Sequence, residues 1–173
     1  LASRVKISGA GTTRVLTVWG GATVTLQALD VVDGSAGSDG GGGIRNLGDL
    51  TVTGCQVTGN ETAGNGGGIW NGGVLSIAGG TVIAGNHGGY GGGIRNDGTL
   101  NITGSAIIGN TAEFGGGIDN YAGSMALVDV EVEDNVATHY GGGVTTGAPA
   151  TISGSIIRGN SAEELADSLL GSL

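Results

Sequence analysis

Short runs of alternating apolar and polar residues recur along the chain with a period of about 25 residues. In one repeat the first run is Leu50–Thr53, with sequence LTVT, and the second is Cys55–Thr58, with sequence CQVT. Alternation with a period of two is typical of β-strands, whereas an amphipathic helix places apolar residues three and four positions apart. Gly54 separates the two runs, and glycine readily adopts the positive φ angle of a sharp bend. The pattern therefore predicts short strands joined by tight bends.

Two phrases repeat with the same period. Gly-Gly-Gly-Ile or Gly-Gly-Gly-Val occurs at nearly equal steps, of which the last is the longest, at Gly41–Ile44, Gly66–Ile69, Gly91–Ile94, Gly115–Ile118 and Gly141–Val144. The second phrase is an aliphatic residue, two further residues and an asparagine; its asparagines are Asn60, Asn86, Asn110, Asn135 and Asn160. Self-similarity at a fixed period of this length predicts a stack of equivalent structural repeats.

The repeats predict an all-β fold, a single-stranded parallel β-helix of about six coils, with about 25 residues and three strands in each coil. Successive coils of such a solenoid stack about 4.8 Å apart as parallel sheets. The first coil has lost both phrases but keeps the alternation: Val24 lies one period before Leu50. We expect Val18 to take the place of Ile44 in this coil.

The chain divides into a solenoid and a short C-terminal segment. We expect the β-helix to span residues 1–160, with degenerate coils over 1–40 and regular repeats over 41–160. Ser161–Glu164 has the form of a helix capping box, and leucines follow it at helical spacing. A capping α-helix is therefore predicted over 161–173, where it would cover the open end of the last coil. A helix that docks another domain is the alternative.

Asparagine recurs at two inward positions of the repeat. A side-chain amide both donates and accepts hydrogen bonds, so stacked copies can bond to one another and to the backbone of a turn. One predicted column contains Asn60, Asn86, Asn110, Asn135 and Asn160. The other contains Asn46, Asn71, Asn96 and Asn120, and Thr146 is expected to break it. We interpret both columns as structural; binding of a ligand by these asparagines is the alternative.

Composition agrees with a narrow solenoid and excludes several other classes. Glycine makes up 41 of the 173 residues without the three-residue period of collagen. Hydrophobic residues make up 38% and recur in register, which argues against disorder. Aromatic residues make up only 3%, so Ile, Val, Leu and Ala must fill the core. The single cysteine, Cys55, excludes an internal disulfide and is expected to pack inward as a small core residue.

The net charge of −9 makes nucleic acid a poor partner, because binding to phosphate backbones requires clustered Lys and Arg. No apolar run approaches the roughly 20 residues needed to span a bilayer, so no membrane insertion is expected.

Outward residues on neighbouring coils can be compared column by column, since equivalent side chains lie about 4.8 Å apart. One column contains Arg45, Trp70, Arg95 and Asp119. The first interpretation is a self-stabilising strip, in which both guanidinium groups flank the indole ring and Arg95 pairs with Asp119. The second is a platform for a sugar or an anion, with Trp70 as its stacking surface.

A second outward column is aromatic. Tyr90, Phe114 and Tyr140 each directly precede a glycine triplet. Aromatic residues on adjacent coils are expected to stack and hold a turn.

Apolar side chains also face outward from the second run of several repeats. Exposed apolar patches commonly mark contact sites, so this patch predicts an interface, with a covering loop as the alternative. Its residues are Val82, Ala84, Ala106, Ile108 and Ile156.

Carboxylates gather on one coil. Oxygen ligands of this kind can hold Ca²⁺, and the four candidates are Asp129, Glu131, Glu133 and Asp134. No segment wraps around them, so we expect no cofactor, with Ca²⁺ as the alternative. Glu133 is expected to pair with Arg158 one coil on.

The two repeated phrases resemble those of polymorphic outer membrane proteins, which are bacterial surface β-helices carried as autotransporter passengers. Val57–Asn60 is similar to the Phe-x-x-Asn phrase of that family, with Val in place of Phe. Gly66–Ile69 is similar to its Gly-Gly-Ala-Ile phrase, with Gly in place of Ala. The resemblance covers about residues 41–160 and implies a right-handed β-helix, exposure at the cell surface and adhesion.

These observations favour a non-catalytic, adhesin-like binding or structural module, extracellular or at the cell surface. Its expected partner is a surface glycan, another surface protein or a second copy of itself. The alternative is a self-assembling subunit of a filament or surface layer with lateral or end-to-end contacts. A polysaccharide-active enzyme is a third and less favoured hypothesis. The outward strands offer no convergent carboxyl pair, and the coils are too short to build a cleft. An ice-binding protein is equally third. Such proteins carry regular Thr-x-Thr arrays, and here only Thr51 and Thr53 form an intact pair.

Overall fold

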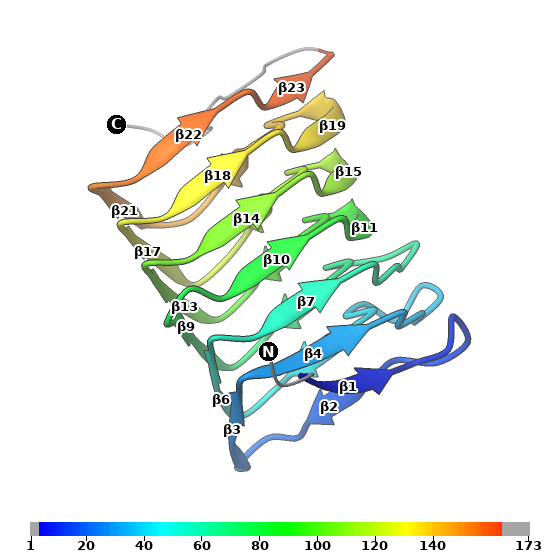
Figure 1. The fold of residues 1–173 in the computed structure, drawn as a ribbon. Coiled ribbons are helices and arrows are strands. Elements are labelled where there is room, and N and C mark those ends of the chain that lie inside the picture. Colours follow the sequence, from blue (N-terminus) through cyan, green and yellow to red (C-terminus); the bar gives the residue numbers. More distant parts are fainter. Residues whose placement is uncertain (1–3, 164–173) are drawn as a thin grey trace.

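The computed structural model describes residues 4–163, which wind into a β-solenoid of about six turns (Figure 1). All strand pairs in this part of the chain are parallel, and each strand lies beside its equivalents in neighbouring coils. The same residues contain no helix. The prediction of an all-β parallel solenoid is therefore confirmed. The predicted start of the C-terminal helix is wrong, because Ser161–Ala162 pair with β19 as strand β23. The rest of the helix predicted over 161–173, from residue 164, lies outside the described residues.

Two sheets carry the strands that follow each glycine triplet. Sheet 1 contains β2 (Leu16–Val18), β5 (Ile44–Asn46), β8 (Ile69–Asn71), β12 (Ile94–Asn96), β16 (Ile118–Asn120) and β20 (Val144–Thr146). Sheet 2 contains β3 (Thr23–Gln27), β6 (Asp49–Thr53), β9 (Val74–Ala78), β13 (Thr99–Thr103), β17 (Ser124–Val128) and β21 (Ala150–Ser153). Each coil then bends into sheet 3 at a residue with positive φ, such as Gly54 at 58°.

Sheet 3 is the longest. It contains β1 (Val5–Ser8), β4 (Leu29–Val32), β7 (Gln56–Thr58), β10 (Val82–Ala84), β14 (Ala106–Ile108), β18 (Glu131–Glu133) and β22 (Ile156–Arg158). Its register pairs Val57 with Ile83, and Ile83 with Ile107, so the aliphatic residue of the asparagine phrase always faces inward.

A fourth sheet runs through the later coils, where the prediction of three strands per coil is wrong. Sheet 4 contains β11 (His87–Tyr90), β15 (Thr111–Phe114), β19 (Val136–Tyr140) and β23 (Ser161–Ala162). The inward positions of these strands are small residues, including Gly88, Ala112 and Ala137, all of them buried. Small inward residues give no alternation of large apolar and polar side chains, so the hydrophobic pattern does not reveal these strands.

The first coil is shifted from its predicted register. Strand β2 pairs Leu16 with Ile44 and Val18 with Asn46, so the prediction that Val18 replaces Ile44 is wrong. Val24 pairs with Leu50, as predicted. An alternating pattern looks the same after a shift of two positions, and the first coil carries no glycine triplet to fix its register.

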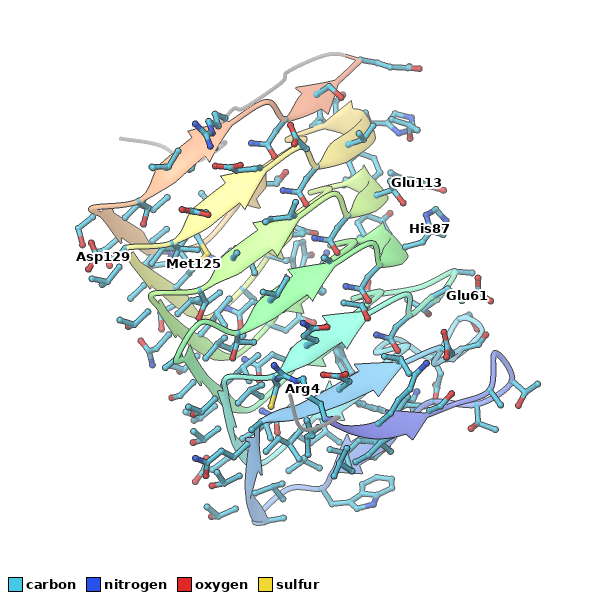
Figure 2. All side chains as sticks on the ribbon, in the orientation of Figure 1. Arg4, Glu61, His87, Glu113, Met125 and Asp129 are labelled. Carbon is cyan, nitrogen blue, oxygen red and sulfur yellow. The ribbon has the colours of Figure 1, made fainter. Side chains whose placement is uncertain are left out.

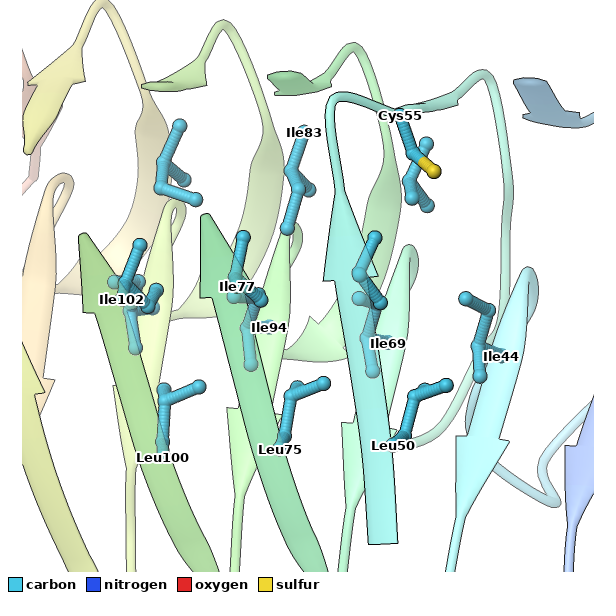
Figure 3. Packing of buried hydrophobic residues seen from close by; sticks show 14 of the residues in the cluster. Ile44, Leu50, Cys55, Ile69, Leu75, Ile77, Ile83, Ile94, Leu100 and Ile102 are labelled. Carbon is cyan, nitrogen blue, oxygen red and sulfur yellow. The ribbon is translucent and has the colours of Figure 1, made fainter. Parts of the chain in front are cut away.

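Inside the tube, aliphatic side chains of one kind stack on one another from coil to coil (Figure 3). The columns drawn include Ile44, Ile69 and Ile94 from sheet 1, and Leu50, Leu75 and Leu100 from sheet 2. Cys55 is buried among them as a free thiol, which confirms its predicted place in the core. Because each side chain meets its own kind one coil away, the narrow core is filled without aromatic residues.

The asparagine ladder that follows sheet 3 leaves no amide group of Asn110 unpaired. Nδ2 of Asn110 donates to Oδ1 of Asn135 at 2.9 Å and to the carbonyl oxygen of Ile83 at 3.0 Å. Its Oδ1 accepts from Nδ2 of Asn86 at 2.9 Å and from the backbone N–H of Asn86 at 3.0 Å. The same pattern repeats along the predicted column from Asn60 to Asn160. The predicted structural role of this column is therefore confirmed.

The second ladder lies inside sheet 1 and ends differently from the prediction. Asn46, Asn71, Asn96 and Asn120 are joined by Nδ2-to-Oδ1 hydrogen bonds of 2.7–2.8 Å. Nδ2 of Asn120 then donates to Oγ1 of Thr146 at 2.9 Å. Thr146 therefore continues the ladder by one step, because a hydroxyl oxygen accepts as an amide oxygen does.

The glycine triplet before each sheet 1 strand uses its three positions for different reasons. Gly91 has a φ of 66°, which residues other than glycine rarely adopt. A Cβ on Gly92 would lie 2.4 Å from the carbonyl oxygen of Thr111, and one on Gly93 would lie 3.1 Å from Nδ2 of Asn110. The triplet thus lets the chain turn, pass close to the next coil and pack on the ladder before it enters β12.

Candidate functional site

The predicted outward column of sheet 1 is confirmed by the strand register. Arg45 pairs with Trp70, Trp70 with Arg95, and Arg95 with Asp119. Each of these residues stands between a fully buried aliphatic residue and a buried ladder asparagine. The backbone is therefore fixed on both sides of every outward side chain, which places the column on rigid strands.

At one end of the column, Arg45 and Trp70 form part of the predicted strip. The guanidinium of Arg45 lies 4.7 Å from the centroid of the Trp70 ring. Nη1 of Arg45 donates to Oδ2 of Asp39 at 3.4 Å, and Nε1 of Trp70 donates to Oδ2 of Asp97 at 2.5 Å. The indole is thus held by its edge and covered by a cation.

Arg95 does not flank the indole as the strip interpretation predicts; it turns toward two tyrosines instead. Its guanidinium lies 4.2 Å from the ring centroid of Tyr121 and 5.3 Å from that of Tyr90. Nε of Arg95 donates to Oδ1 of Asp97 at 3.1 Å, and Nη1 donates to Oδ2 of Asp119. The predicted pair of Arg95 and Asp119 is confirmed. The side chain of Arg95 turns away from the indole because Asp97, which directly follows the ladder residue Asn96, accepts a hydrogen bond from it at the corner where Tyr121 lies.

The predicted aromatic column is confirmed and borders this corner. The rings of Tyr90 and Phe114 stack with centroids 5.1 Å apart and an angle of 8° between their planes. Phe114 and Tyr140 are tilted, with centroids 5.6 Å apart. A bulge between β15 and β19 pairs Phe114 with Tyr140 and adds one residue to β19 between Ala137 and Tyr140. His139 lies in this bulge, and its ring stacks on Phe114 with centroids 4.8 Å apart. This extra residue lies within the longest step between triplets, the one that ends at Gly141.

An open groove of about 330 Å³ lies between the aromatic column and the outward column of sheet 1. Its lining residues are Asn65, Tyr90, Arg95, Phe114, Asp119, Tyr121 and Thr145. Two of the four residues predicted to bind a ligand, Arg95 and Asp119, therefore lie in the groove, whereas Arg45 and Trp70 lie further along the column.

The groove has a charged floor and aromatic walls. Arg95 and Asp119 are only 7% and 4% exposed, whereas Tyr121 is 65% exposed. Burial raises the pKa of Asp119 above its ordinary value of 3.8; the charge and hydrogen bond of Arg95 oppose this rise, and Asp97 adds to it. Arg95 with its two carboxylate partners carries a net charge of about −1 when both are ionised.

Tyr121 is an exposed residue of the groove that the sequence pattern misses. It follows the ladder residue Asn120 directly. The other coils have Trp19, Leu47, Gly72, Asp97 and Gly147 at this position. This corner position varies among the coils, and two of its residues are large exposed aromatics. Variation at one position of a regular repeat is the signal that could have identified it.

The predicted apolar interface lies on the outer face of sheet 3, but it is not continuous. Val82 pairs with Ala106, and Ala84 with Ile108, so these four residues adjoin. Strand β18 places Glu131 and Glu133 between them and Ile156. The four adjoining residues are half-buried, and only Ile156 is well exposed. Their role as an interface stays a prediction.

The four calcium candidates do not converge. Glu133 accepts a hydrogen bond from Nε of Arg158 at 2.7 Å, as predicted. Asp129 and Asp134 both have a φ of 54° and occupy bend positions that are glycines in the next coil, Gly154 and Gly159. Within residues 4–163, no group of three acidic, His or Cys side chains is placed to hold a metal ion. Figure 2 shows Asp129 at the corner between sheets 2 and 3, whereas Asp134 lies at the bend that follows strand β18.

Comparison of the chain with protein-family models, with curated protein sequences and with solved structures gives no match. The resemblance to polymorphic outer membrane proteins therefore rests on the repeated phrases alone. In the described part of the chain, no helix has the length and apolar character required to cross a membrane.

Proposed function

We propose that the chain is a non-catalytic binding module of an extracellular or cell-surface protein and that its groove takes a glycan. The observation that carries this proposal is the exposed Tyr121 beside the buried pair of Arg95 and Asp119. A sugar ring has an apolar face that packs on an aromatic ring and hydroxyl groups that bond to charged side chains. Ligand sites typically combine such an apolar lining with a few fixed polar groups.

The bonding around Arg95 supports a binding role over a catalytic one. A glycosidase needs one carboxyl group as acid and a second as nucleophile or base, each free to meet the substrate. Here Asp97 accepts from both Trp70 and Arg95, and Asp119 accepts from Arg95. Both carboxylates orient the guanidinium, which leaves the groove with fixed hydrogen-bonding groups.

Self-association remains the second candidate, through the outer face of sheet 3. Val82, Ala84, Ala106 and Ile108 form one block of apolar side chains across β10 and β14. Glu131 and Glu133 interrupt that face, and removing their charges from water in an interface would be unfavourable. This interruption is why glycan binding ranks first.

The finer architecture belongs to the same proposal. We infer a right-handed coil, because connections between parallel strands of one sheet are right-handed in about 98% of cases. We also infer that a helix within the residues after β23 covers the last coil. Ile152 and Ile157 in that coil are partly exposed, whereas their equivalents Leu127 and Val132 are fully buried.

A glycan array probed with the purified chain and with Tyr121→Ala tests the function. We expect a defined set of bound oligosaccharides, and about tenfold weaker binding for the variant, which corresponds to about 1.4 kcal/mol. Trp19→Ala is the matched control, because Trp19 occupies the same corner position four coils away, roughly 19 Å along the stack, and is 66% exposed. Equal losses in both variants, or no glycan bound by the unchanged chain, would rule out the groove.

A further inference from the structure

Arg14 and Arg45 differ from the other basic residues in how their charge is balanced. Arg4 pairs with Asp30, Lys6 with Asp33, Arg158 with Glu133, and Arg95 with both Asp97 and Asp119. Arg14 and Arg45 share a single carboxylate oxygen, Oδ2 of Asp39, at 3.3 and 3.4 Å. Among residues 4–163 neither arginine forms another ion pair, so these two arginines and Asp39 together carry one excess positive charge.

Arg45 also has a hydrogen-bond donor, its Nε, that is unused. Its Nη1 donates to Asp39, but its Nε is buried without any partner among the described residues. A buried donor without an acceptor is unfavourable, and native structures usually satisfy such groups. Because Nε is enclosed, an incoming anion meets the terminal Nη groups of Arg45, and such groups bond well to the oxygens of a carboxylate or sulfate group.

The two arginines are held in place, whereas their shared partner is loosely held. Arg14 donates from Nε to the carbonyl oxygens of Gly40 and Gly41 at 3.2 and 3.0 Å. Arg45 stacks on Trp70. The side chain of Asp39 is 71% exposed, and exposed ion pairs of this kind are weak. A ligand with an oxyanion can therefore displace Asp39 while both guanidinium groups keep their positions.

We propose that Arg14 and Arg45 form a binding site for an oxyanion, a carboxylate or sulfate group, which the carboxylate of Asp39 occupies in the free protein. The incoming anion takes the place of Asp39 and accepts from Nη1 of Arg45 and Nη2 of Arg14, the two donors that Asp39 uses. Arg45 lies two coils, about 10 Å, from Arg95 along the same column. The site therefore suits the acidic group of a glycan that also lies in the groove; this last step rests on the proposed function.

NMR spectra of the arginine Nε–Hε groups test the site directly. Sodium sulfate, sodium glucuronate and glucose are titrated separately into the whole chain at constant ionic strength. We expect saturable shifts of the Arg14 and Arg45 signals with sulfate, glucuronate or both, and none with glucose. The two salts distinguish a sulfate site from a carboxylate site. Shifts that do not saturate, or that are equally large at Arg158, would overturn the proposal.

Three variants separate a built site from general charge attraction. Asp39→Asn removes the competing carboxylate, so affinity for the anion should rise about threefold or more. Arg45→Lys keeps the charge but loses the planar guanidinium and its Nη donors, so affinity should fall about tenfold. Arg158→Lys is the control and should leave affinity unchanged. Equal or weaker binding by Asp39→Asn would show that Asp39 does not occupy an anion site, and the proposal would fail.

The outcome is independent of the groove. If neutral oligosaccharides bind through Tyr121 while sulfate and glucuronate do not bind, the oxyanion site is wrong and the proposed function stands. If the anions bind at Arg45 but no glycan binds, the site stands and the proposed function is wrong. Success of both predicts that acidic oligosaccharides bind more tightly than neutral ones of equal length, and that only Arg45→Lys removes the difference.

Discussion

Two columns of sheet 1 lie one residue apart on the same strands and follow opposite rules. The inward column repeats asparagine from Asn46 to Asn120 and joins each copy to the next by the same hydrogen bond. The outward column changes residue from each coil to the next, from Arg45 to Asp119, and its members form different contacts in each. The same strands therefore carry one column that repeats a single residue and a single contact, and one column in which both the residue and its contacts differ from coil to coil.

This contrast shows how functional residues can be recognised in a repeat protein. A residue that recurs in every coil, such as Asn96, makes contacts that any coil of the stack requires. A residue found once, such as Tyr121, makes contacts that the stack does not require. In this chain three residues that do not repeat, Arg95, Asp119 and Tyr121, line the same groove.

The greatest loss of stability should come from replacing an asparagine of an inward ladder. Asn110→Leu removes the acceptor of two donors of Asn86, its backbone N–H and its Nδ2. A buried donor left unpaired costs about 1–3 kcal/mol, so the free energy of unfolding should fall by about 4 kcal/mol. Urea denaturation followed by circular dichroism measures it. Asn101→Leu is the matched control on the exposed face of β13 and should change stability by less than about 0.5 kcal/mol. Similar losses in both variants would refute the ladder.

Most of the solenoid could be predicted because its rules repeat. Five copies of each phrase give the period, the inward faces and the register of sheets 1, 2 and 3 without any tertiary information. Sheet 4 could not be predicted, because Ala112 and Ala137 are too small to stand out as inward residues. The first coil was placed out of register because alternation alone does not distinguish Leu16 from Val18 as the partner of Ile44.

The next effect tests the outward column, where the residues are individual. Arg95→Met removes the cation that Asp97 and Asp119 share. Breaking a buried pair leaves an uncompensated charge, so unfolding free energy should fall by about 3 kcal/mol at neutral pH. Thermal and urea denaturation measure the loss. Arg158→Met breaks an exposed pair on sheet 3 and should leave stability unchanged. If both variants are equally stable, the floor of the groove contributes nothing to the fold.

The site could be predicted only in part, for a physical reason. Register places Arg95 beside Trp70, and the sequence reveals that neighbourhood correctly. The direction in which a long guanidinium turns depends on acceptors at the adjoining corner, here Asp97, and on rings such as Tyr121. The direction of the side chain therefore depends on the three-dimensional geometry of the corner, which cannot be inferred by aligning the repeats.

A smaller effect is expected at the place where the inward column changes residue. Thr146→Val keeps the shape of the side chain but removes the hydroxyl that accepts from Nδ2 of Asn120. The carbonyl oxygens of Ala148 and Pro149 lie 3.4 and 3.5 Å from the same nitrogen and can compensate in part. We expect a loss of about 1 kcal/mol in the free energy of unfolding. Thr146→Asn, which restores the rule of the column, should change stability by less than about 0.5 kcal/mol. A loss from Asn as large as that from Val would show that the last coil does not extend the ladder.

The weakest of these effects is a change in how stability depends on pH. Burial raises the folded-state pKa of Asp119 above 3.8, so between 3.8 and the raised value the folded chain holds a proton that the unfolded chain has lost. The contribution of Asp119 to stability should therefore fall as pH rises through this window. Urea denaturation of the chain and of Asp119→Asn between about pH 3 and pH 7 isolates it, and the difference in unfolding free energy should favour the unchanged chain most at low pH. A difference that grows with pH would mean that Arg95 outweighs burial. Asp119 would then be fully ionised, and the floor of the groove would offer a glycan only an acceptor at that position.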